Sequence, residues 1–247
     1  MANAVLTDEV KDVLRRATVD GNVLYLPEGQ LDRKVYEAVN KALTNAGGKW
    51  KTRVGHVFPS DAGAKLAAML DSGVSVDEKK RYQAFFTPDD LAIRVVALAN
   101  VQGQRVLEPS AGRGVLADTC MTQGALSVSC FELNPEYVNE LRRKRYTVIE
   151  GNFLDYSPGT GADYQRIVMN PPFTKNQDIK HVRHALKWLK PGGILVAIML
   201  NNQTRKGFVD LNVEFEPEIE ELERGTFNES GTDVPTLIVK VVKTTST

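Results

Sequence analysis

Short apolar runs alternate with helical segments from residue 91 to residue 242, and this alternation restricts the fold more than any other feature of the sequence. Runs of branched apolar residues predict strands, and apolar positions recurring every three to four residues predict helices. The expected strands cover 105–107, 126–131, 146–150, 166–169, 194–200 and 236–242, with Phe227 in a further short strand, and the expected helices cover 91–99, 114–122, 135–144 and 179–189. Alternating strands and helices imply a parallel sheet with helices on both faces, which binds ligands at the carboxyl ends of its strands. We therefore expect an α/β fold with a Rossmann-like, doubly wound, mainly parallel sheet of seven strands.

The chain divides near residues 71–81, where Asp71-Ser72-Gly73 and the charged run 77–81 interrupt the apolar pattern. We expect residues 1–75 to form a small N-terminal module and residues 76–247 to form the α/β domain. Four apolar residues of the first module recur at helical spacing, namely Leu31, Val35, Val39 and Leu43. The segment 50–58 then alternates like a short hairpin, so the module is predicted to be a helix plus a hairpin.

Charge, cysteine and histidine content restrict the chemistry. The 31 basic and 31 acidic residues cancel, so any contact with nucleic acid must come from a local patch. Cys120 and Cys130 lack the paired spacing of a metal site, and we expect both to be buried small side chains and the protein to hold no metal. His181 and His184 lie one helical turn apart and are expected on a solvated face without a role. No apolar run is long enough to cross a membrane and Met1–Ala4 opens no secretory signal, so we expect a cytoplasmic protein.

The expected hairpin carries a local basic patch. Lys49, Lys51 and Arg53 are interleaved there with Trp50 and Phe58. Cations beside aromatic rings are typical of surfaces that contact nucleic acid. The alternative is a hydrophobic surface that docks on the α/β domain.

A glycine turn follows the first strand of the α/β domain. Leu107-Glu108-Pro109-Ser110-Ala111-Gly112-Arg113-Gly114 ends a strand and opens a helix, and its glycines permit a tight turn and close approach of a ligand. The third glycine of a dinucleotide fingerprint is missing, and no lysine-serine pair of a phosphate loop follows. On this pattern alone, a structural turn and a binding loop are equally compatible with the sequence.

Two further strand ends supply parts of a nucleoside site. Glu132 lies about 20 residues beyond the glycine turn, the distance at which an acid can accept hydrogen bonds from both ribose hydroxyls. Asn152 follows the third strand and can pair with an adenine edge, while Phe153 can cover the face of the ring. Asp155 is the alternative to Asn152 as the partner of the adenine amine.

The segment Asn170-Pro171-Pro172-Phe173 closes the strand 166–169 and carries the most specific chemistry. The Asn170 side-chain oxygen and the Pro171 carbonyl can accept both N–H bonds of a planar amine, which favours the pyramidal geometry in which the nitrogen lone pair attacks. Phe173 can stack on the ring that bears this amine. The segment predicts a catalytic site for an exocyclic amine, with the N6 of adenine as the best-fitting target.

Together with Phe85-Phe86-Thr87-Pro88 ahead of it, this set of motifs resembles the class I S-adenosylmethionine-dependent methyltransferases that modify adenine N6, in their gamma-type order. The resemblance covers residues 82–243 and implies S-adenosylmethionine as cofactor, with its methionine end held by the Phe-Thr-Pro segment and the glycine turn. The implied cofactor contacts are Phe86, Thr87, Pro88, Glu108, Pro109, Ala111, Gly112, Glu132, Leu133, Asn152, Phe153 and Asn170.

The resemblance also implies a catalytic set and a substrate. Asn170, Pro171, Pro172 and Phe173 would be catalytic, and Phe227 would join Phe173 at the target base, although Phe227 also fits as a core or hairpin aromatic. The implied partner is nucleic acid, with DNA ranked first. Low sequence specificity is expected because the large target-recognition region of the family is missing and the loop after Phe173 is short.

Other functions remain compatible with these residues. Adenine in RNA would use the same groups. A protein glutamine amide fits a similar clamp, although the enzymes that modify it usually carry tyrosine at the place of Phe173 and lack the upstream Phe-Thr-Pro. A non-catalytic DNA-binding or inhibitor protein on a methyltransferase scaffold is the third alternative, against which the intact Glu108, Glu132 and Asn170 count. The sequence does not predict the oligomeric state and is compatible with a dimer.

Overall fold

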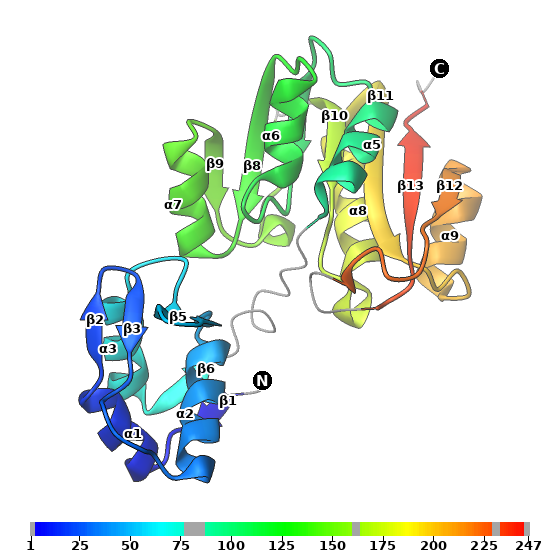
Figure 1. The fold of residues 1–247 in the computed structure, drawn as a ribbon. Coiled ribbons are helices and arrows are strands. Elements are labelled where there is room, and N and C mark those ends of the chain that lie inside the picture. The colour runs from blue at the N-terminus through cyan, green and yellow to red at the C-terminus, as the bar shows by residue number, and fades with distance from the viewer. Residues whose placement is uncertain (1–2, 77–86, 160–163, 229–232, 245–247) are drawn as a thin grey trace. The chain divides into compact units, whose positions relative to one another are not determined.

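The computed structural model describes residues 3–76, 87–159, 164–228 and 233–244. Its internal contacts divide the chain into two units, Met1–Gln83 and Ala84–Thr247 (Figure 1). The boundary expected after residue 75 directly precedes residues 77–86, which lie outside the described ranges. Each unit is described by itself.

The second unit is built on one sheet of seven strands. The strands are β7 (Arg105–Glu108), β8 (Ser127–Glu132), β9 (Thr147–Glu150), β10 (Tyr164–Met169), β11 (Leu189–Leu200), β12 (Glu218–Glu221) and β13 (Thr236–Val242), and they lie in the order β12-β13-β11-β10-β7-β8-β9. The pairs from β11 to β9 are all parallel, whereas β13 is antiparallel to both of its neighbours. This confirms the expected α/β fold with a mainly parallel, doubly wound sheet of seven strands.

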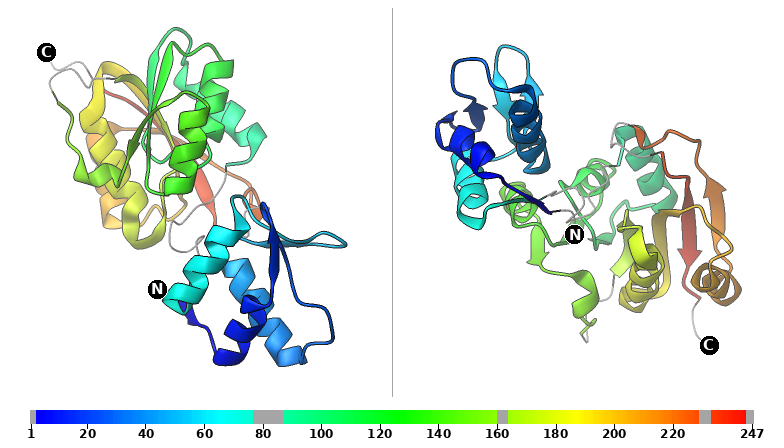
Figure 2. Two further views of the ribbon diagram at one scale, coloured as in Figure 1. Left: turned by 90° about the vertical axis from the view of Figure 1, so that its left-hand side faces the viewer. Right: turned by 90° about the horizontal axis from the view of Figure 1, so that it is seen from below.

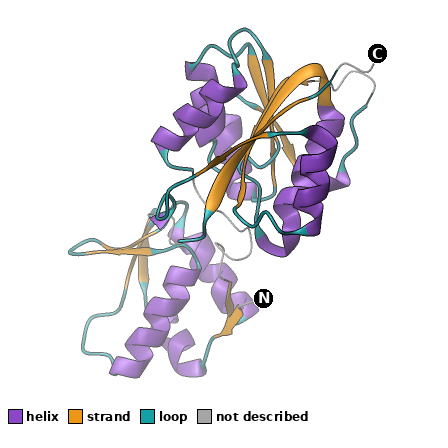
Figure 3. Cartoon of the chain, turned by 90° about the vertical axis from the view of Figure 1, so that its right-hand side faces the viewer, coloured by secondary structure: helices purple, strands orange, loops and turns teal. Residues whose placement is uncertain are grey.

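Helices cover both faces of this sheet (Figure 3). α5 (Asp89–Ala99), α6 (Val115–Thr122) and α7 (Pro135–Arg143) contribute to one apolar core, and α8 (Gln177–Trp188) and α9 (Lys206–Phe215) contribute to the other. The central strands β10 and β11 are apolar over most of their length because they are buried on both faces.

The order of the strands reverses beside β7. From β7 the chain moves outward through β8 and β9, and it then returns to the other side of β7 to form β10 and β11. In open α/β sheets, such a reversal separates the loops that follow the two adjacent strands and leaves room for a ligand at their carboxyl ends. The loops after β7 and β10 are therefore where a binding site is expected.

The structure corrects one expected strand and adds two elements. Phe227 lies in a turn, and the edge strand is instead β12, whose sequence Glu-Ile-Glu-Glu gave no apolar signal. An edge strand exposed to water can be polar at most positions, so its pattern resembles that of a loop. α9 was also not expected from the sequence.

The first unit contains two small sheets and three helices within the described residues. Its elements are β1 (Asn3–Val5), α1 (Asp8–Arg15), β2 (Thr18–Asp20), β3 (Val23–Tyr25), α2 (Arg33–Asn45), β4 (Lys49–Lys51), β5 (Gly55–Val57), α3 (Ala62–Ser72) and β6 (Val74–Val76). β1 pairs with β6, and the other four strands form an antiparallel sheet in the order β2-β3-β5-β4. α2 and α3 pack on this sheet (Figure 2). The expected helix and hairpin correspond to α2 and to β4 with β5.

Among the described residues, no helix has both the length and the apolar character needed to span a bilayer.

Candidate active site

A pocket lies at the carboxyl ends of β7 and β10, where the strand order reverses. The pocket is partly open to solvent, and the space of about 280 Å³ between its lining residues includes part of that solvent. Its lining residues are Thr87, Glu108, Ser110, Ala111, Gly112, Arg113, Val115, Leu116 and Asn170. Five of these, Thr87, Glu108, Ala111, Gly112 and Asn170, are among the residues expected at the cofactor.

Glu108, at the end of β7, places a buried carboxyl group in the wall of the pocket. The residue is 1% exposed, and within the described part of the chain its Oε2 has no hydrogen-bond partner. Burial raises the pKa of Glu108 well above its usual range, and the N–H of Ala117 opposes this shift. The neighbouring Glu132 and Asp118 raise the pKa further. A carboxyl group in this setting is suited to a ligand that brings a positive charge or a hydrogen-bond donor.

The glycine turn follows directly. Gly112 has a φ of 55° and Gly114 has a φ of 87°, both in the left-handed region that disfavours residues with a Cβ atom. A Cβ at Gly112 would meet no atom within 4 Å, so this backbone borders open space. A Cβ at Gly114 would lie 2.7 Å from Cδ2 of Leu141 on α7. Gly112 thus leaves room for a ligand, and Gly114 permits the close packing of α6 against α7.

Glu132, at the end of β8, is held by three backbone N–H groups. Its Oε2 accepts a 2.6 Å hydrogen bond from Gly112, and its Oε1 accepts from Leu133 at 2.8 Å and Asn134 at 2.7 Å. Burial raises the pKa of Glu132, and these three N–H groups oppose that shift. A carboxylate can accept about four hydrogen bonds, so capacity remains for a ligand hydroxyl.

The loop after β9 brings Asn152 and Asp155 together. Nδ2 of Asn152 donates a 3.1 Å hydrogen bond to Asp155, and its Oδ1 accepts from the N–H of Leu154 at the start of the short 3-10 helix η1 (Phe153–Asp155). Both candidate partners of an adenine amine therefore lie at one place. Neither residue lines the pocket, nor does the half-exposed Leu133.

Phe153 occupies a different position from the one expected. Its side chain is 2% exposed and packs in the core on the α8 side of the sheet. Its ring centroid lies 5.0 Å from that of Phe131 and 5.6 Å from that of Trp188. In this structure the ring covers no part of the pocket, because the apolar contacts of the core hold it.

Asn170 follows β10 and contacts the segment ahead of α5. Its Nδ2 donates a 3.1 Å hydrogen bond to the hydroxyl of Thr87, and both residues line the pocket. Pro88 precedes α5 as its N-terminal cap residue. Phe86 lies outside the described residues.

The aromatic residues expected at the substrate lie together but are buried. Phe173 is 6% exposed and Phe227 is 1% exposed. Their rings meet edge to face, with centroids 6.5 Å apart and an interplanar angle of 85°. Of the two interpretations of Phe227, the core aromatic is the one that this structure contains.

His181 of α8 is buried, contrary to the expectation, and His184 is half-buried. His181 is 5% exposed, and its Nδ1 lies 3.4 Å from the hydroxyl of Ser110 in the glycine turn. Burial and, less strongly, the neighbouring His184 lower the pKa of His181 to about 4, while Asp178 opposes the shift. His184 contacts the carbonyl oxygen of Tyr156 through Nε2 at 2.7 Å. The helix buries this face because it packs on Phe153.

Other pocket residues were not singled out from the sequence. Ser110 and Arg113 belong to the glycine turn, and Val115 and Leu116 begin α6. Their place within or directly after the turn was the signal that could have identified them. Cys120 and Cys130 are buried, as expected, and burial raises the pKa of both thiols. The described residues contain no group of three or more histidine, cysteine or acidic side chains that could hold a metal ion.

The fold and this site define a class I S-adenosylmethionine-dependent methyltransferase. The family model "Methyltransferase small domain" matches residues 91–225, more than half of the chain, and the chain belongs to this family. A search of curated proteins gave no significant match.

Solved structures show the same fold. A proposed RNA methyltransferase from Pyrococcus horikoshii is 20% identical over 66% of this chain and 88% of that chain, with a TM-score of 0.56. The 23S rRNA methyltransferase ErmE is 18% identical over 65% of this chain and 70% of that chain, with a TM-score of 0.51. At these identities, the likeness concerns the architecture of the methyltransferase domain.

Proposed function

We propose that the protein transfers a methyl group from S-adenosylmethionine to the N6 amine of adenine in DNA, with low sequence specificity. The observation that carries the proposal is the position of Asn170: the residue that opens the Asn-Pro-Pro-Phe segment lines the same pocket as Glu108 and Gly112. An acceptor for the amine and the groups suited to the cofactor thus share one site, at the place beside β7 where the strand order reverses.

The residues present fit the cofactor. S-adenosylmethionine, when bound, supplies a methyl group on a positively charged sulfur. Burial and the nearby acids make ionisation of the Glu108 carboxyl unfavourable, and a cation beside it would offset both effects and favour the carboxylate. Gly112 leaves open space at its Cα, and Glu132 keeps capacity to accept from a ribose hydroxyl. We assign the adenine edge to Asn152, with Asp155 beside it, and further contacts to Phe86, Thr87, Pro88, Pro109, Ala111 and Leu133.

The proposed chemistry needs two hydrogen-bond acceptors for the amine. Oδ1 of Asn170 and the carbonyl oxygen of Pro171 accept the two N–H bonds, so that the nitrogen becomes pyramidal and its lone pair is available for attack. Pro171 has a fixed φ and no N–H, so it presents this carbonyl without a competing donor. Most of the rate then comes from holding the amine and the methyl donor in line, about 3–3.5 Å apart.

A target base would stack on Phe173, and this requires a local rearrangement. Phe173 is only 6% exposed and the edge of Phe227 lies against it. We assign both Phe173 and Phe227 to the substrate side of the site. Because the edge of Phe227 lies against Phe173, Phe227 must move when a base enters. Removing a base from a duplex costs a few kcal/mol, and stacking on an aromatic ring returns about 1–3 kcal/mol. Single-stranded or distorted DNA is therefore the favoured substrate.

Adenine in RNA is the second candidate. Two solved structures that share the fold, with TM-scores of 0.56 and 0.51, are described as RNA methyltransferases, one of them acting on 23S rRNA. The acceptors on Asn170 and Pro171 would serve either nucleic acid.

The test is a transfer assay with tritiated S-adenosylmethionine and DNA, RNA or protein as separate acceptors, followed by nucleoside and amino-acid analysis. We expect label in N6-methyl-2′-deoxyadenosine from DNA. Asn170→Ala should lower the transfer rate about 100-fold or more, since one transition-state partner is lost, while cofactor affinity measured by calorimetry changes little. Asn212→Ala, in an exposed position of α9, is the matched control and should keep full activity.

Each other outcome has a defined meaning. Label in RNA or in protein glutamine would move the substrate to that class. Cofactor binding without transfer to any acceptor would support a non-catalytic protein on this scaffold. An Asn170→Ala protein that keeps more than about a tenth of the rate would contradict the role of the two acceptors.

A further inference from the structure

We propose that the outer face of the four-stranded sheet in the first unit binds single-stranded nucleic acid and stacks a base on Tyr25. This proposal concerns binding and does not depend on which acceptor the second unit methylates. It would stand even if the proposed methyl transfer to adenine failed.

The pairing of the strands decides which side chains share this face. Residues paired across antiparallel strands point to the same side, and neighbours along a strand point to opposite sides. Leu24 and His56 are paired, are 0% exposed and point to the core under α2, where Nε2 of His56 lies 2.9 Å from Oδ1 of Asn40. The opposite face of the sheet carries Thr18, Asp20, Val23, Tyr25, Lys49, Lys51, Gly55 and Val57.

Tyr25 forms an exposed aromatic platform on this outer face. The residue is 40% exposed and its ring lies against Gly55, where an added Cβ would come within 3.3 Å of Cδ1 of Tyr25. The missing side chain at Gly55 lets the ring lie along the sheet. Val23 and Val57, half-buried and paired with each other, continue the apolar surface beside it. A flat exposed ring with apolar neighbours is suited to stacking of an unpaired base.

Cations lie on one side of this platform, on β4 and the turn after it. Lys49 is paired with Val57 and Lys51 with Gly55, so both lysines project on the same face as Tyr25, and both are exposed. Arg53 is exposed in the turn that joins β4 to β5, where the N–H of Val54 donates to the carbonyl of Lys51. The acid on the same face is Asp20, on the opposite edge strand β2. The charge around the hairpin is therefore complementary to a phosphate backbone.

The residues of the hairpin formed by β4 and β5 lie on different faces of the sheet. Trp50 is paired with His56, so it lies on the other side of the sheet from Tyr25; it is 52% exposed, and its ring meets that of His56 at a centroid distance of 5.0 Å. The lysines on either side of Trp50 point to the outer face. The stacking ring of the proposed surface thus comes from β3 and its cations come from β4. The occupant must be single-stranded, because a base is available to stack on Tyr25 only when it is unpaired.

The test measures affinity by fluorescence anisotropy with the full chain and a labelled oligonucleotide of mixed sequence. Single-stranded DNA, single-stranded RNA and duplex DNA form three arms. Tyr25→Ala should weaken binding to the single strands roughly 5- to 100-fold, and Tyr25→Phe should keep it, because stacking needs the ring rather than the hydroxyl. The matched control is Tyr36→Ala, which removes a tyrosine of similar exposure, 39%, from α2.

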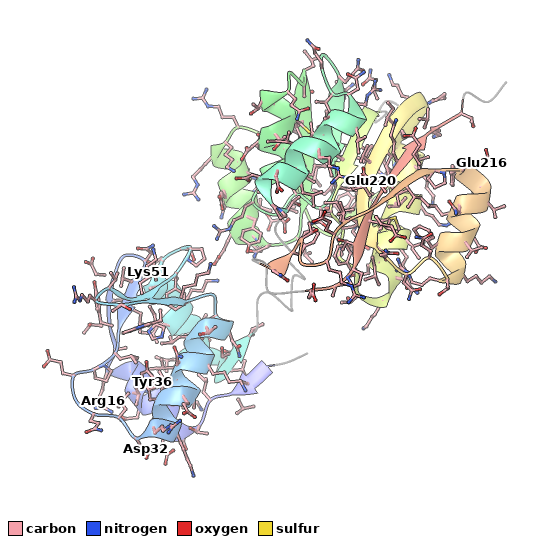
Figure 4. The ribbon with its side chains drawn as sticks, turned by 45° about the vertical axis from the view of Figure 1, so that its right-hand side comes forward. Arg16, Asp32, Tyr36, Lys51, Glu216 and Glu220 are labelled. Carbon is pink, nitrogen blue, oxygen red and sulfur yellow. The ribbon has the colours of Figure 1, made fainter. Side chains whose placement is uncertain are left out.

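The lysines are tested through salt dependence. In the double variant Lys49→Ala/Lys51→Ala, the slope of log affinity against log salt should fall in magnitude by about 1.4, as expected for two lost phosphate contacts on a single strand. Lys34→Ala/Lys41→Ala removes two exposed lysines of α2 instead and should leave the slope nearly unchanged. Figure 4 shows Lys51 at the hairpin and Tyr36 on α2.

The outcomes separate this proposal from the methylation proposal. All binding measurements are repeated in the Asn170→Ala background, where the surface should bind as before. Tighter binding of the DNA or of the RNA single strand shows which nucleic acid the surface prefers. Either result supports the proposal that this face binds a single strand. The proposal is overturned if the parent chain binds neither single strand, if duplex binds best, if Tyr25→Ala binds like Tyr36→Ala, or if both lysine pairs change the slope equally. Circular dichroism melts of each variant establish that a loss of binding is not a loss of folding.

Discussion

Nδ2 of Asn170 donates a 3.1 Å hydrogen bond to the hydroxyl oxygen of Thr87, and this bond joins residues 83 positions apart in the chain. An amide group whose nitrogen is bound on one side presents its oxygen on the other side. Thr87 therefore determines the orientation of the Asn170 amide at the pocket. Because Pro88 and Asp89 begin α5 directly after Thr87, the orientation of this amide is tied to the packing of a helix.

Thr87→Val removes this acceptor while it keeps the shape of the side chain. We expect kcat/KM for methyl transfer to fall about 2- to 10-fold, the effect of one neutral hydrogen bond, with a smaller effect on the affinity for the cofactor. Thr87→Ser restores the hydroxyl and should restore most of the rate. A serine variant as slow as the valine variant would show that the hydroxyl is not the group that matters.

Glu108→Gln should make the cofactor-free protein more stable at neutral and alkaline pH. The pKa of Glu108 is raised in the folded protein, so the folded state keeps a proton that the unfolded state releases. The stability from this protonated carboxyl is complete below about pH 4.5, the usual pKa, and is lost as the pH rises through the folded pKa. Glutamine cannot ionise and removes this loss.

Melting temperatures at pH 5 and pH 8 measure this effect in the parent and in Glu108→Gln. The gain of the variant should be larger at pH 8. The same substitution should weaken binding of S-adenosylmethionine, because the positive sulfur favours the ionised form of Glu108 beside it and an amide cannot ionise. Equal stability differences at the two pH values would contradict the raised pKa.

His181→Asn should flatten the loss of stability in mild acid. Burial lowers the pKa of His181 to about 4 in the folded protein, so between about pH 6.5 and 4 the unfolded chain binds a proton that the folded chain does not. Stability therefore falls as the pH falls through this range, by on the order of 3 kcal/mol for the full difference. Urea melts at pH 7.5 and pH 4.5 give the size of the loss in both proteins. A variant that loses as much stability as the parent would rule out His181 as the cause.

The alternation of strands and helices was enough to predict the architecture of the second unit. Parallel strands such as β10 and β11 are buried on both faces, so their positions are visible as continuous apolar runs. Glu108, Gly112 and Asn170 could be expected at one site because the carboxyl ends of adjacent parallel strands meet at one edge of the sheet. At these positions the local sequence motifs and the order of the strands predict the same site.

The remaining features depend on packing that a local pattern does not contain. Phe153 follows a strand end like the other site residues, yet its ring packs against Phe131 and Trp188 in the core. His181 lies one helical turn before His184, a spacing that predicted a solvated face. His181 is buried beside Ser110 only because of where α8 packs in the tertiary structure. The outer face of the small sheet depends on the pairing of β3 with β5, which brings Tyr25 to Gly55 from a distant part of the chain.

The buried ion pair between Asp178 and Arg205 gives the sharpest stability prediction. Asp178 is 0% exposed at the start of α8, and both of its oxygens accept 2.8 Å hydrogen bonds from Arg205 in the loop after β11. Arg205→Met should destabilise the protein by about 3–5 kcal/mol, because it leaves a buried carboxylate without its cation. Asp178→Leu/Arg205→Met removes both charges and should recover part of this loss.

An exposed ion pair on the same helix supplies the control. Arg183 pairs with Glu214 at 2.7 Å, but their side chains are 35% and 53% exposed. Solvent screens such a pair, so Arg183→Met should cost less than about 1 kcal/mol. Urea unfolding of the four proteins measures all of these differences. If Arg205→Met and Arg183→Met destabilise equally, then the pair at Asp178 is not buried in solution, and the loop after β11 is not held against α8 as the structure has it.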